Sequence, residues 1–76
     1  MDYIDYELTP VDSSNIAEIG YDEDSEVLIV EFLTGARYIY NYVENYVYDE
    51  LMEATSKGSY FYWNIRKGGY DYQRIN

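Results

Sequence analysis

The sequence predicts an α+β domain: a three-stranded antiparallel β-meander followed by two short α-helices packed on one face of the sheet. Two observations support this fold class. Residues 27–42 (VLIVEFLTGARYIYNY) alternate with a period of two and are rich in β-branched and aromatic side chains, as in a β-hairpin. From residue 43 onward the spacing becomes helical, because Val47, Leu51 and Ala54 fall at positions i, i+4 and i+7.

Residues 1–10 form an acidic N-terminal arm that precedes the predicted domain, residues 11–76. Ile4, Tyr6 and Leu8 alternate with other residues, mostly acidic, and Pro10 ends the run. Proline and acidic residues suit an edge strand because they discourage further pairing. The arm is therefore either a loose segment or an added edge strand. It could cover an apolar strip of the sheet within one chain, or reach a second copy of the protein.

Residues 15–21 (NIAEIGY) are the first predicted strand, with a turn before it and an acidic loop after it. In the turn, Ser13 and Ser14 suit local capping of the backbone rather than nucleophilic catalysis, because the chain has no histidine to act as a base. The loop, residues 22–26, resembles the start of a calcium loop. Such a loop needs a glycine sixth and a glutamate twelfth, where this chain has Val27 and Leu33. A solvated acidic turn is the better interpretation.

The register of the hairpin follows from its side chains. A three-residue loop, residues 33–35, places Gly35 in the left-handed conformation that glycine adopts without a Cβ clash. This loop matches apolar residues across the strands and sets one acid against one base. The predicted pairs are Phe32 with Ala36, Val30 with Tyr38, Leu28 with Tyr40, Ile29 with Ile39, and Glu31 with Arg37.

The helical half contains two segments and an undecided C-terminus. Residues 43–55 form the first helix, and Ser56 opens a second helix, residues 57–66, which Gly68 and Gly69 end. Residues 70–76 (YDYQRIN) are either a tail or a short closing strand. We expect the core to contain apolar residues of both halves: Leu28, Val30, Phe32, Tyr38, Tyr40, Val47, Leu51, Phe61 and Ile65.

The composition argues against several classes of function. The chain has no cysteine, which excludes disulfides and thiolate metal sites. Without histidine or cysteine, no set of nucleophile, base and orienting group can be named, so we expect no enzyme activity, catalytic residue, bound metal or cofactor. No apolar run approaches the roughly 18 residues of a membrane span, so we expect a cytoplasmic protein that does not bind a membrane.

The charge is unevenly distributed along the chain. The net charge is −10; residues 1–53 contain fourteen acids and only Arg37 as a base, whereas residues 54–76 contain four bases and one acid. The overall field repels nucleic acid and attracts a basic partner surface. Solubility alone is an equally good explanation of the acidity.

A series of short segments with characteristic spacings runs from about Val11 to the end of the chain. The series includes Ser13-Ser14-Asn15-Ile16, Ile19-Gly20-Tyr21-Asp22, Leu28-x-Val30-x-Phe32, Gly35-x-x-Tyr38-x-Tyr40, Val43, Val47-Tyr48, Leu51, Ala54, Ser56, Gly58, Tyr60-Phe61, Ile65-Arg66 and Tyr70. Together these spacings resemble the KTSC domain, a family named after the C-terminus of some lysyl-tRNA synthetases and also found as a free-standing small protein.

The family's best-known mark is a YxY sequence, here Tyr38 and Tyr40. We interpret both tyrosines, with Gly35, as structural family residues, because the register makes the two rings face Val30 and Leu28. Two positions depart from the family's usual pattern: Glu44 stands where proline is usual, and Tyr62 where asparagine is frequent. The resemblance implies no established catalytic role, and RNA binding has been suggested for the family.

Two functions from different classes remain. The first is a non-catalytic module, such as an accessory protein or phage-type inhibitor, that binds a basic protein partner or a second copy through an acidic, tyrosine-rich surface. Its candidate residues are Tyr3, Ile4, Tyr6, Leu8, Asp22, Asp24 and Tyr46. The second is RNA binding by the C-terminal segment, where bases stand among aromatic rings. Its candidate residues are Lys57, Tyr60, Tyr62, Trp63, Arg66, Lys67, Tyr70 and Arg74.

Overall fold

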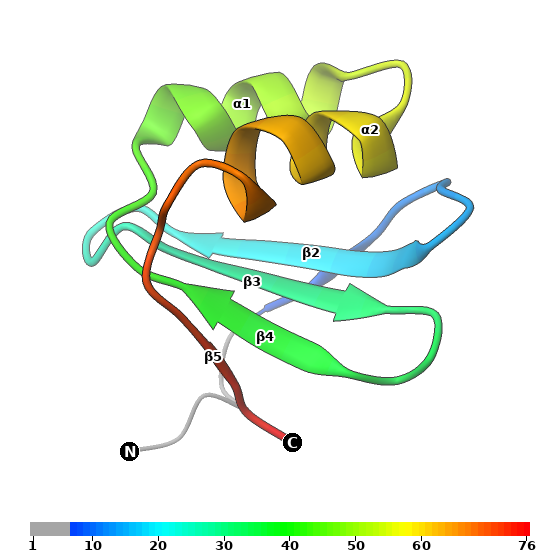
Figure 1. Ribbon diagram of the computed structural model, residues 1–76, viewed down its shortest axis with the longest axis horizontal. Helices are drawn as coiled ribbons and strands as arrows, with labels where there is room; N and C mark the ends of the chain where they lie inside the picture. The colour runs from blue at the N-terminus through cyan, green and yellow to red at the C-terminus, as the bar shows by residue number, and fades with distance from the viewer. Residues whose placement is uncertain (1–6) are drawn as a thin grey trace.

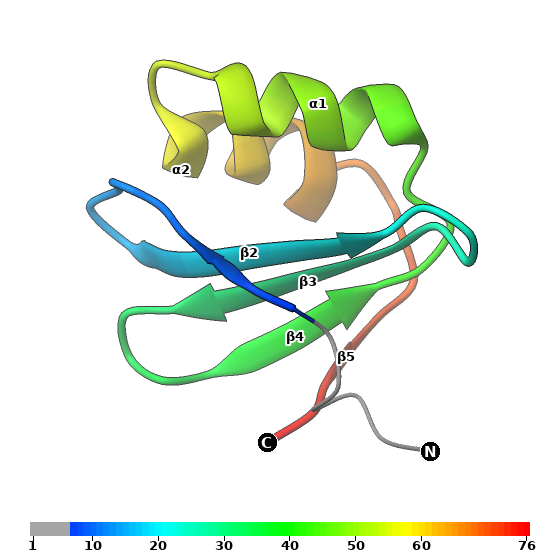
Figure 2. The same ribbon diagram turned by 180° about the vertical axis from the view of Figure 1, so that it is seen from behind.

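The computed structural model describes residues 7–76, which form one antiparallel sheet with helices on one of its faces (Figure 1). The elements in chain order are β1 (Thr9–Pro10), β2 (Ile16–Asp22), β3 (Val27–Phe32), β4 (Arg37–Tyr40), α1 (Asn45–Glu53), α2 (Lys57–Phe61), a π-helical turn η2 (Tyr62–Arg66) and β5 (Tyr72–Arg74). Seen from behind, β1 crosses beside β2 and the helices again lie on a single side of the sheet (Figure 2).

The predicted α+β class and the helices on one face are confirmed, and the predicted three-stranded meander matches part of the sheet, namely β2, β3 and β4. Within residues 7–76 the sheet has five strands, in the order β1-β2-β3-β4-β5. The N-terminal arm contributes β1, which pairs with β2, and the undecided C-terminus forms β5, which pairs with β4. These edge strands are two and three residues long. Segments so short cannot display a clear period of two, which is why the sequence pattern left both of them undecided between strand and irregular chain.

The predicted hairpin register is confirmed. Leu28 pairs with Tyr40, Val30 with Tyr38 and Glu31 with Arg37. The Arg37 side chain forms an ion pair with Glu31, with Nη2 2.6 Å from Oε1. Gly35 has a φ of +95°, the left-handed conformation that the three-residue loop requires. The loop closes by a hydrogen bond from the Phe32 amide to the Ala36 carbonyl oxygen, at 2.9 Å.

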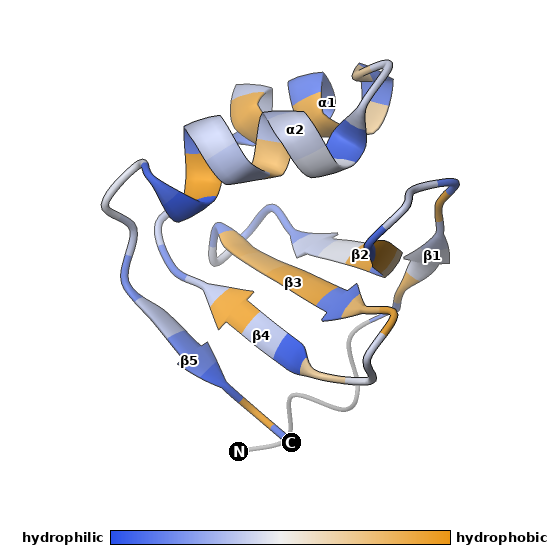
Figure 3. Cartoon of the chain, turned by 45° about the vertical axis from the view of Figure 1, so that its right-hand side comes forward, coloured by the Kyte–Doolittle hydropathy of each residue, from blue (hydrophilic) through white to orange (hydrophobic). Residues whose placement is uncertain are grey.

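The main core lies between the sheet and the helices, and it contains every predicted core residue. The fully buried side chains include Leu28, Val30 and Leu51, while Phe32 and Tyr38 are half-buried at its margin. Figure 3 shows apolar segments of α1, α2 and β3 facing one another across this layer. Alternation along the strands therefore decides which side chains meet the helices.

A smaller apolar strip lies on the opposite face of the sheet. Val27, Ile29 and Ile39 form it, and Leu8 and Ile75 pack against it. The arm reaches this strip because Gly20 has no side chain; a Cβ there would lie 2.5 Å from the Glu7 carbonyl oxygen. The described part of the arm thus covers the strip within the same chain. The remaining arm residues, which include the predicted Tyr3, Ile4 and Tyr6, lie outside the described residues.

Local hydrogen bonds define the ends of the helical half. The Ser56 hydroxyl accepts a hydrogen bond from the Ser59 amide, at 3.2 Å, and caps α2 as predicted. After Phe61 the helix widens into the π turn, where the Lys67 amide bonds to the Tyr62 carbonyl oxygen, at 3.1 Å. Gly69 follows with a φ of +84° and ends the segment.

Candidate functional site

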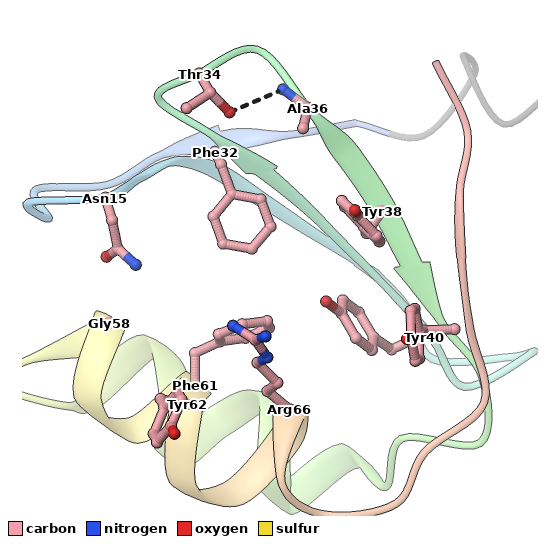
Figure 4. A pocket seen from close by; sticks show the side chains of 11 residues that line it. Asn15, Phe32, Thr34, Ala36, Tyr38, Tyr40, Gly58, Phe61, Tyr62 and Arg66 are labelled. Carbon is pink, nitrogen blue, oxygen red and sulfur yellow. Dashed lines mark hydrogen bonds between the residues drawn. The ribbon is translucent and has the colours of Figure 1, made fainter.

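A groove of about 490 Å³ lies between the β3–β4 hairpin and the α2–η2 segment (Figure 4). This volume is typical of small-ligand and peptide-side-chain sites. The groove is lined by aromatic, polar and small residues from five parts of the chain: Asn15, Phe32, Thr34, Ala36, Tyr38, Tyr40, Gly58, Phe61, Tyr62, Arg66 and Tyr72.

Three tyrosine rings form the floor of the groove on the helix side of the sheet. Tyr38 and Tyr40 are two residues apart on β4, so alternation places both on this side, with ring centroids 6.4 Å apart. Tyr72 of β5 pairs directly with Tyr40, and their rings stack at 5.9 Å. Tyr72 remains 66% exposed, so part of this aromatic floor is open to a ligand.

Phe61 joins the groove to the core. Its ring meets Phe32 edge-on at 5.5 Å and Tyr40 edge-on at 5.4 Å. Such edge-to-face contacts are favourable beyond the area they bury. Tyr62 and Arg66 follow on the π turn and line the groove's outer wall.

Of the residues in the described range 7–76 that line the groove, Arg66 alone is charged. Its guanidinium carbon lies 5.9 Å from the centre of the Tyr62 ring, within the range of a cation–π contact. Its positive charge also acts on Tyr40 in the floor of the groove, where it acts to lower the pKa of the hydroxyl. Burial dominates over this effect and raises the pKa of Tyr40 to about 12, with smaller contributions from Tyr38 and Tyr72. The hydroxyl of Tyr40 is therefore protonated at neutral pH.

Asn15 and Gly58 form the far end of the groove. The Asn15 Oδ1 accepts a hydrogen bond from the Ser13 hydroxyl at 3.1 Å, which fixes the orientation of the amide. Figure 4 shows the amide nitrogen turned toward the groove. A Cβ on Gly58 would overlap Asn15 Oδ1, so glycine at this position lets α2 approach the side chain. The predicted capping role of Ser13 is confirmed, because its hydroxyl also accepts from the Ile16 amide at 3.2 Å.

The structure brings only two of the predicted RNA-binding residues into the groove, Tyr62 and Arg66. Two others hold α1 in place: Tyr60 donates a hydrogen bond to Glu50 at 2.7 Å, and Tyr70 donates one to Glu44 at 2.8 Å. The remaining members lie outside the groove lining. Lys57 donates a hydrogen bond to the Ala54 carbonyl oxygen. The side chains of Trp63, Lys67 and Arg74 are exposed to solvent.

Four of the predicted protein-interface residues, Leu8, Asp22, Asp24 and Tyr46, lie within the described residues 7–76. Leu8 packs on the apolar strip beneath the sheet. Asp22 and Asp24 lie in the β2–β3 turn, where the Asp22 carboxylate accepts from the Asp24 amide at 3.1 Å. Tyr46 is exposed on α1. The role of these residues in binding stays a prediction.

Seven residues that line the groove were not predicted site residues: Asn15, Phe32, Thr34, Ala36, Gly58, Phe61 and Tyr72. Sequence reasoning assigned Tyr38 and Tyr40 to the core, and both also form the groove's floor. The signal available for Tyr38 and Tyr40 was their alternation on one strand face. For Asn15 and Tyr72 there was none, since their proximity to β4 depends on tertiary structure.

Within residues 7–76, no group of three or more potential ligand side chains is arranged to hold a metal ion. In the same part of the chain, no helix combines the length and the apolar character needed to cross a membrane.

Comparisons with known proteins agree with this fold. A model of the KTSC domain family matches residues 12–74. A crystal structure of a KTSC domain protein from Yersinia pestis superposes with a TM-score of 0.84 at 34% identity, covering 92% of this chain and 97% of that one.

Two protein sequences extend the comparison. An uncharacterized protein from Stutzerimonas stutzeri is 39% identical over 64 residues, which cover 84% of this chain and 90% of that protein. A lysine–tRNA ligase from Trichormus variabilis is 36% identical over 75 residues. That match covers 99% of this chain but only 13% of the ligase, so the chain corresponds to a small part of that enzyme.

The raised pKa of Tyr40 predicts a loss of stability in alkali. In the unfolded chain tyrosine ionises near 10.0, whereas in the folded protein Tyr40 ionises at about 12. Its contribution to stability is therefore complete below pH 10 and is lost as the pH rises toward 12. We expect the free energy of unfolding, measured by urea denaturation between pH 10 and 12, to fall less steeply with pH for Tyr40→Phe than for the wild type. Identical declines would contradict the burial of this hydroxyl.

Proposed function

The chain belongs to the KTSC domain family, and we propose that it acts as a small non-catalytic module that binds a protein partner through an acidic, tyrosine-edged surface. The proposal applies to a cytoplasmic protein that works as an accessory factor or a phage-type inhibitor. The partner carries a basic surface, and a second copy of the chain is one candidate.

The supporting observation is a concentration of acidic groups where the β2–β3 turn meets α1. We call this surface the acidic end; it contains Glu23, Glu26, Glu44 and Asp49. Tyr21 marks the centre of this acidic end: its hydroxyl donates to the Val43 carbonyl oxygen at 2.6 Å, and its ring stacks on Tyr48 at 4.7 Å. The pKa of Tyr21 is raised, first by burial and then by the negative charges around it, which are Glu26, Glu23, Asp49 and Glu44.

Within residues 7–76 none of these acids forms an ion pair within 4 Å; the ion pair found there joins Glu31 and Arg37, on another part of the sheet. The acidic end therefore projects a negative field that accelerates encounter with a basic surface. Tyr46, 61% exposed on α1, adds an amphipathic ring of the kind that is enriched in protein interfaces.

Charge reversal tests this proposal. The double variant Glu23→Lys/Asp49→Lys changes two exposed acids at the acidic end. The control Asp12→Lys/Glu53→Lys makes the same charge change in the β1–β2 connection and the last turn of α1. Those two segments lie at the other end of the molecule from the β2–β3 turn (Figure 1). Each tagged protein is used for pull-down from extracts of its native host, followed by mass spectrometry and by direct measurement of affinity for the recovered protein. We expect the first variant to bind about tenfold or more weakly, and its control to retain most affinity.

Equal losses in the two variants would contradict a localised acidic interface, because they would show that only net charge matters. Recovery of the same proteins by wild type and by Glu23→Lys/Asp49→Lys, with equal affinity, would contradict the proposal as a whole.

RNA binding is the second candidate, and the groove favours it. Arg66 stands beside stacked tyrosines, an arrangement that can hold a phosphate and a base. The similarity to part of a lysine–tRNA ligase supports the same candidate. Against it stand the net charge of −10 and the engagement of Tyr60 and Tyr70 with carboxylates.

Filter retention of labelled single-stranded RNA distinguishes this candidate from the first. RNA binding predicts retention at low salt that falls at high salt and is lost with Arg66→Gln. The protein-binding proposal predicts no retention at either salt concentration.

A further inference from the structure

We propose that the groove binds a short peptide segment in which a carboxylate adjoins an aromatic side chain, with the carboxylate on Arg66 and the ring on the tyrosine floor. The inference rests on the proposed protein-binding function and specifies which part of the partner occupies the groove. The acidic end would attract the partner's basic surface, and the groove would hold this separate segment.

The charge of the groove selects an anionic ligand. Among the described residues that line the groove, Arg66 is the one charged residue and none is a carboxylate. Among residues 7–76, Arg66 forms no ion pair within 4 Å, and its contact is the face of the Tyr62 ring. A guanidinium so placed presents N–H donors whose geometry matches a carboxylate bidentately.

The number of positive groups favours a single anion over a polyanion. Nucleic acids bind through several phosphate contacts made by clustered bases. Here Lys67 lies over the Tyr62 ring, with Nζ 5.6 Å from its centroid, and it does not line the groove. Arg74 of β5 is also outside the lining. In a protein of net charge −10, one carboxylate facing one arginine is the better electrostatic match.

The remaining surfaces of the groove suit a peptide. The floor offers aromatic faces next to Arg66, and the exposed part of Tyr72 is free to stack with an incoming ring. At the far end, the fixed Asn15 amide presents an N–H₂ donor, which suits a peptide carbonyl. A carboxylate and a ring on neighbouring residues of one segment would engage Arg66 and the floor together.

Synthetic peptides test this inference with the full-length protein. The first is acetyl-Gly-Phe-Glu-Gly-amide, whose one charge is the glutamate; the second replaces that glutamate with glutamine. The third, acetyl-Gly-Phe-Gly with a free carboxyl terminus, tests whether the carboxylate can come from a chain end. NMR titration of labelled protein measures each affinity and reports the shifts of groove residues.

We expect the glutamate peptide, the free-terminus peptide or both to bind at least about tenfold more tightly than the glutamine peptide, since a charge-assisted hydrogen bond is of that strength. Arg66→Gln should abolish this difference, and Tyr72→Ala should weaken binding of every peptide. Lys67→Gln and Tyr46→Ala are matched controls, because they alter a neighbouring cation and an exposed tyrosine outside the groove. Thermal melts verify that each variant is folded, and Arg66→Met, which also removes the charge, replaces Arg66→Gln if the latter unfolds.

Equal affinity for the glutamine peptide and both carboxylate peptides, or no binding by any of them, would overturn the inference. If uridine monophosphate bound more tightly than all three peptides, and this binding required Arg66, the inference would be overturned in favour of a nucleotide ligand. Either result leaves the acidic end untouched, so a pull-down that still depends on Glu23 and Asp49 would show that only the groove ligand was assigned wrongly.

Discussion

The register between β3 and β4 is the constraint on which the rest of the structure depends. Because successive side chains of a strand point to opposite faces, a slip of one residue would turn Tyr38 and Tyr40 away from the helices. The groove would lose its floor and Phe61 its aromatic partners. Gly35, at a φ of +95°, permits the loop that sets this register, and the Glu31–Arg37 ion pair supports it on the other face.

The groove and the core share residues, which ties the site to the stability of the fold. Tyr40 is almost fully buried, yet the same ring lines the groove, and Phe61 contacts both Tyr40 and Phe32. Because Tyr40 is packed in the core, against Phe61 and against Tyr72, the floor of the groove keeps its geometry before a ligand binds. Such preorganisation reduces the entropic cost of binding. Arg66 and Tyr72, by contrast, are exposed, so we expect their substitution to remove less buried contact than substitution of Tyr40 would. This division makes them the better positions for testing function.

Much of the fold could be predicted from sequence because its signals are local. The strand alternation in residues 27–42, the left-handed position of Gly35 and the Ser56 cap each depend on neighbouring residues. The edge strands β1 and β5 could not be decided from the sequence, which left each open as a strand or irregular chain, since a few residues gain their β conformation from the strand beside them. The site was harder still, because it joins Asn15, Tyr38, Arg66 and Tyr72, which are far apart in the chain. Composition identified Tyr60 and Tyr70 as candidates, but hydrogen bonds to Glu50 and Glu44 engage their hydroxyls.

Substitution of Gly35 tests the central claim, that this loop sets the register which places the tyrosines at the groove. No atom lies within 4 Å of a Cβ built on Gly35, so the effect of a new side chain is one of backbone strain. Denaturant unfolding should show Gly35→Val destabilised by about 1 kcal/mol or more, and Gly35→Asn by less, because asparagine tolerates the left-handed conformation. NMR spectra of both variants should retain the contacts between Val30 and Tyr38. Equal stability of Gly35→Val and wild type would contradict the account.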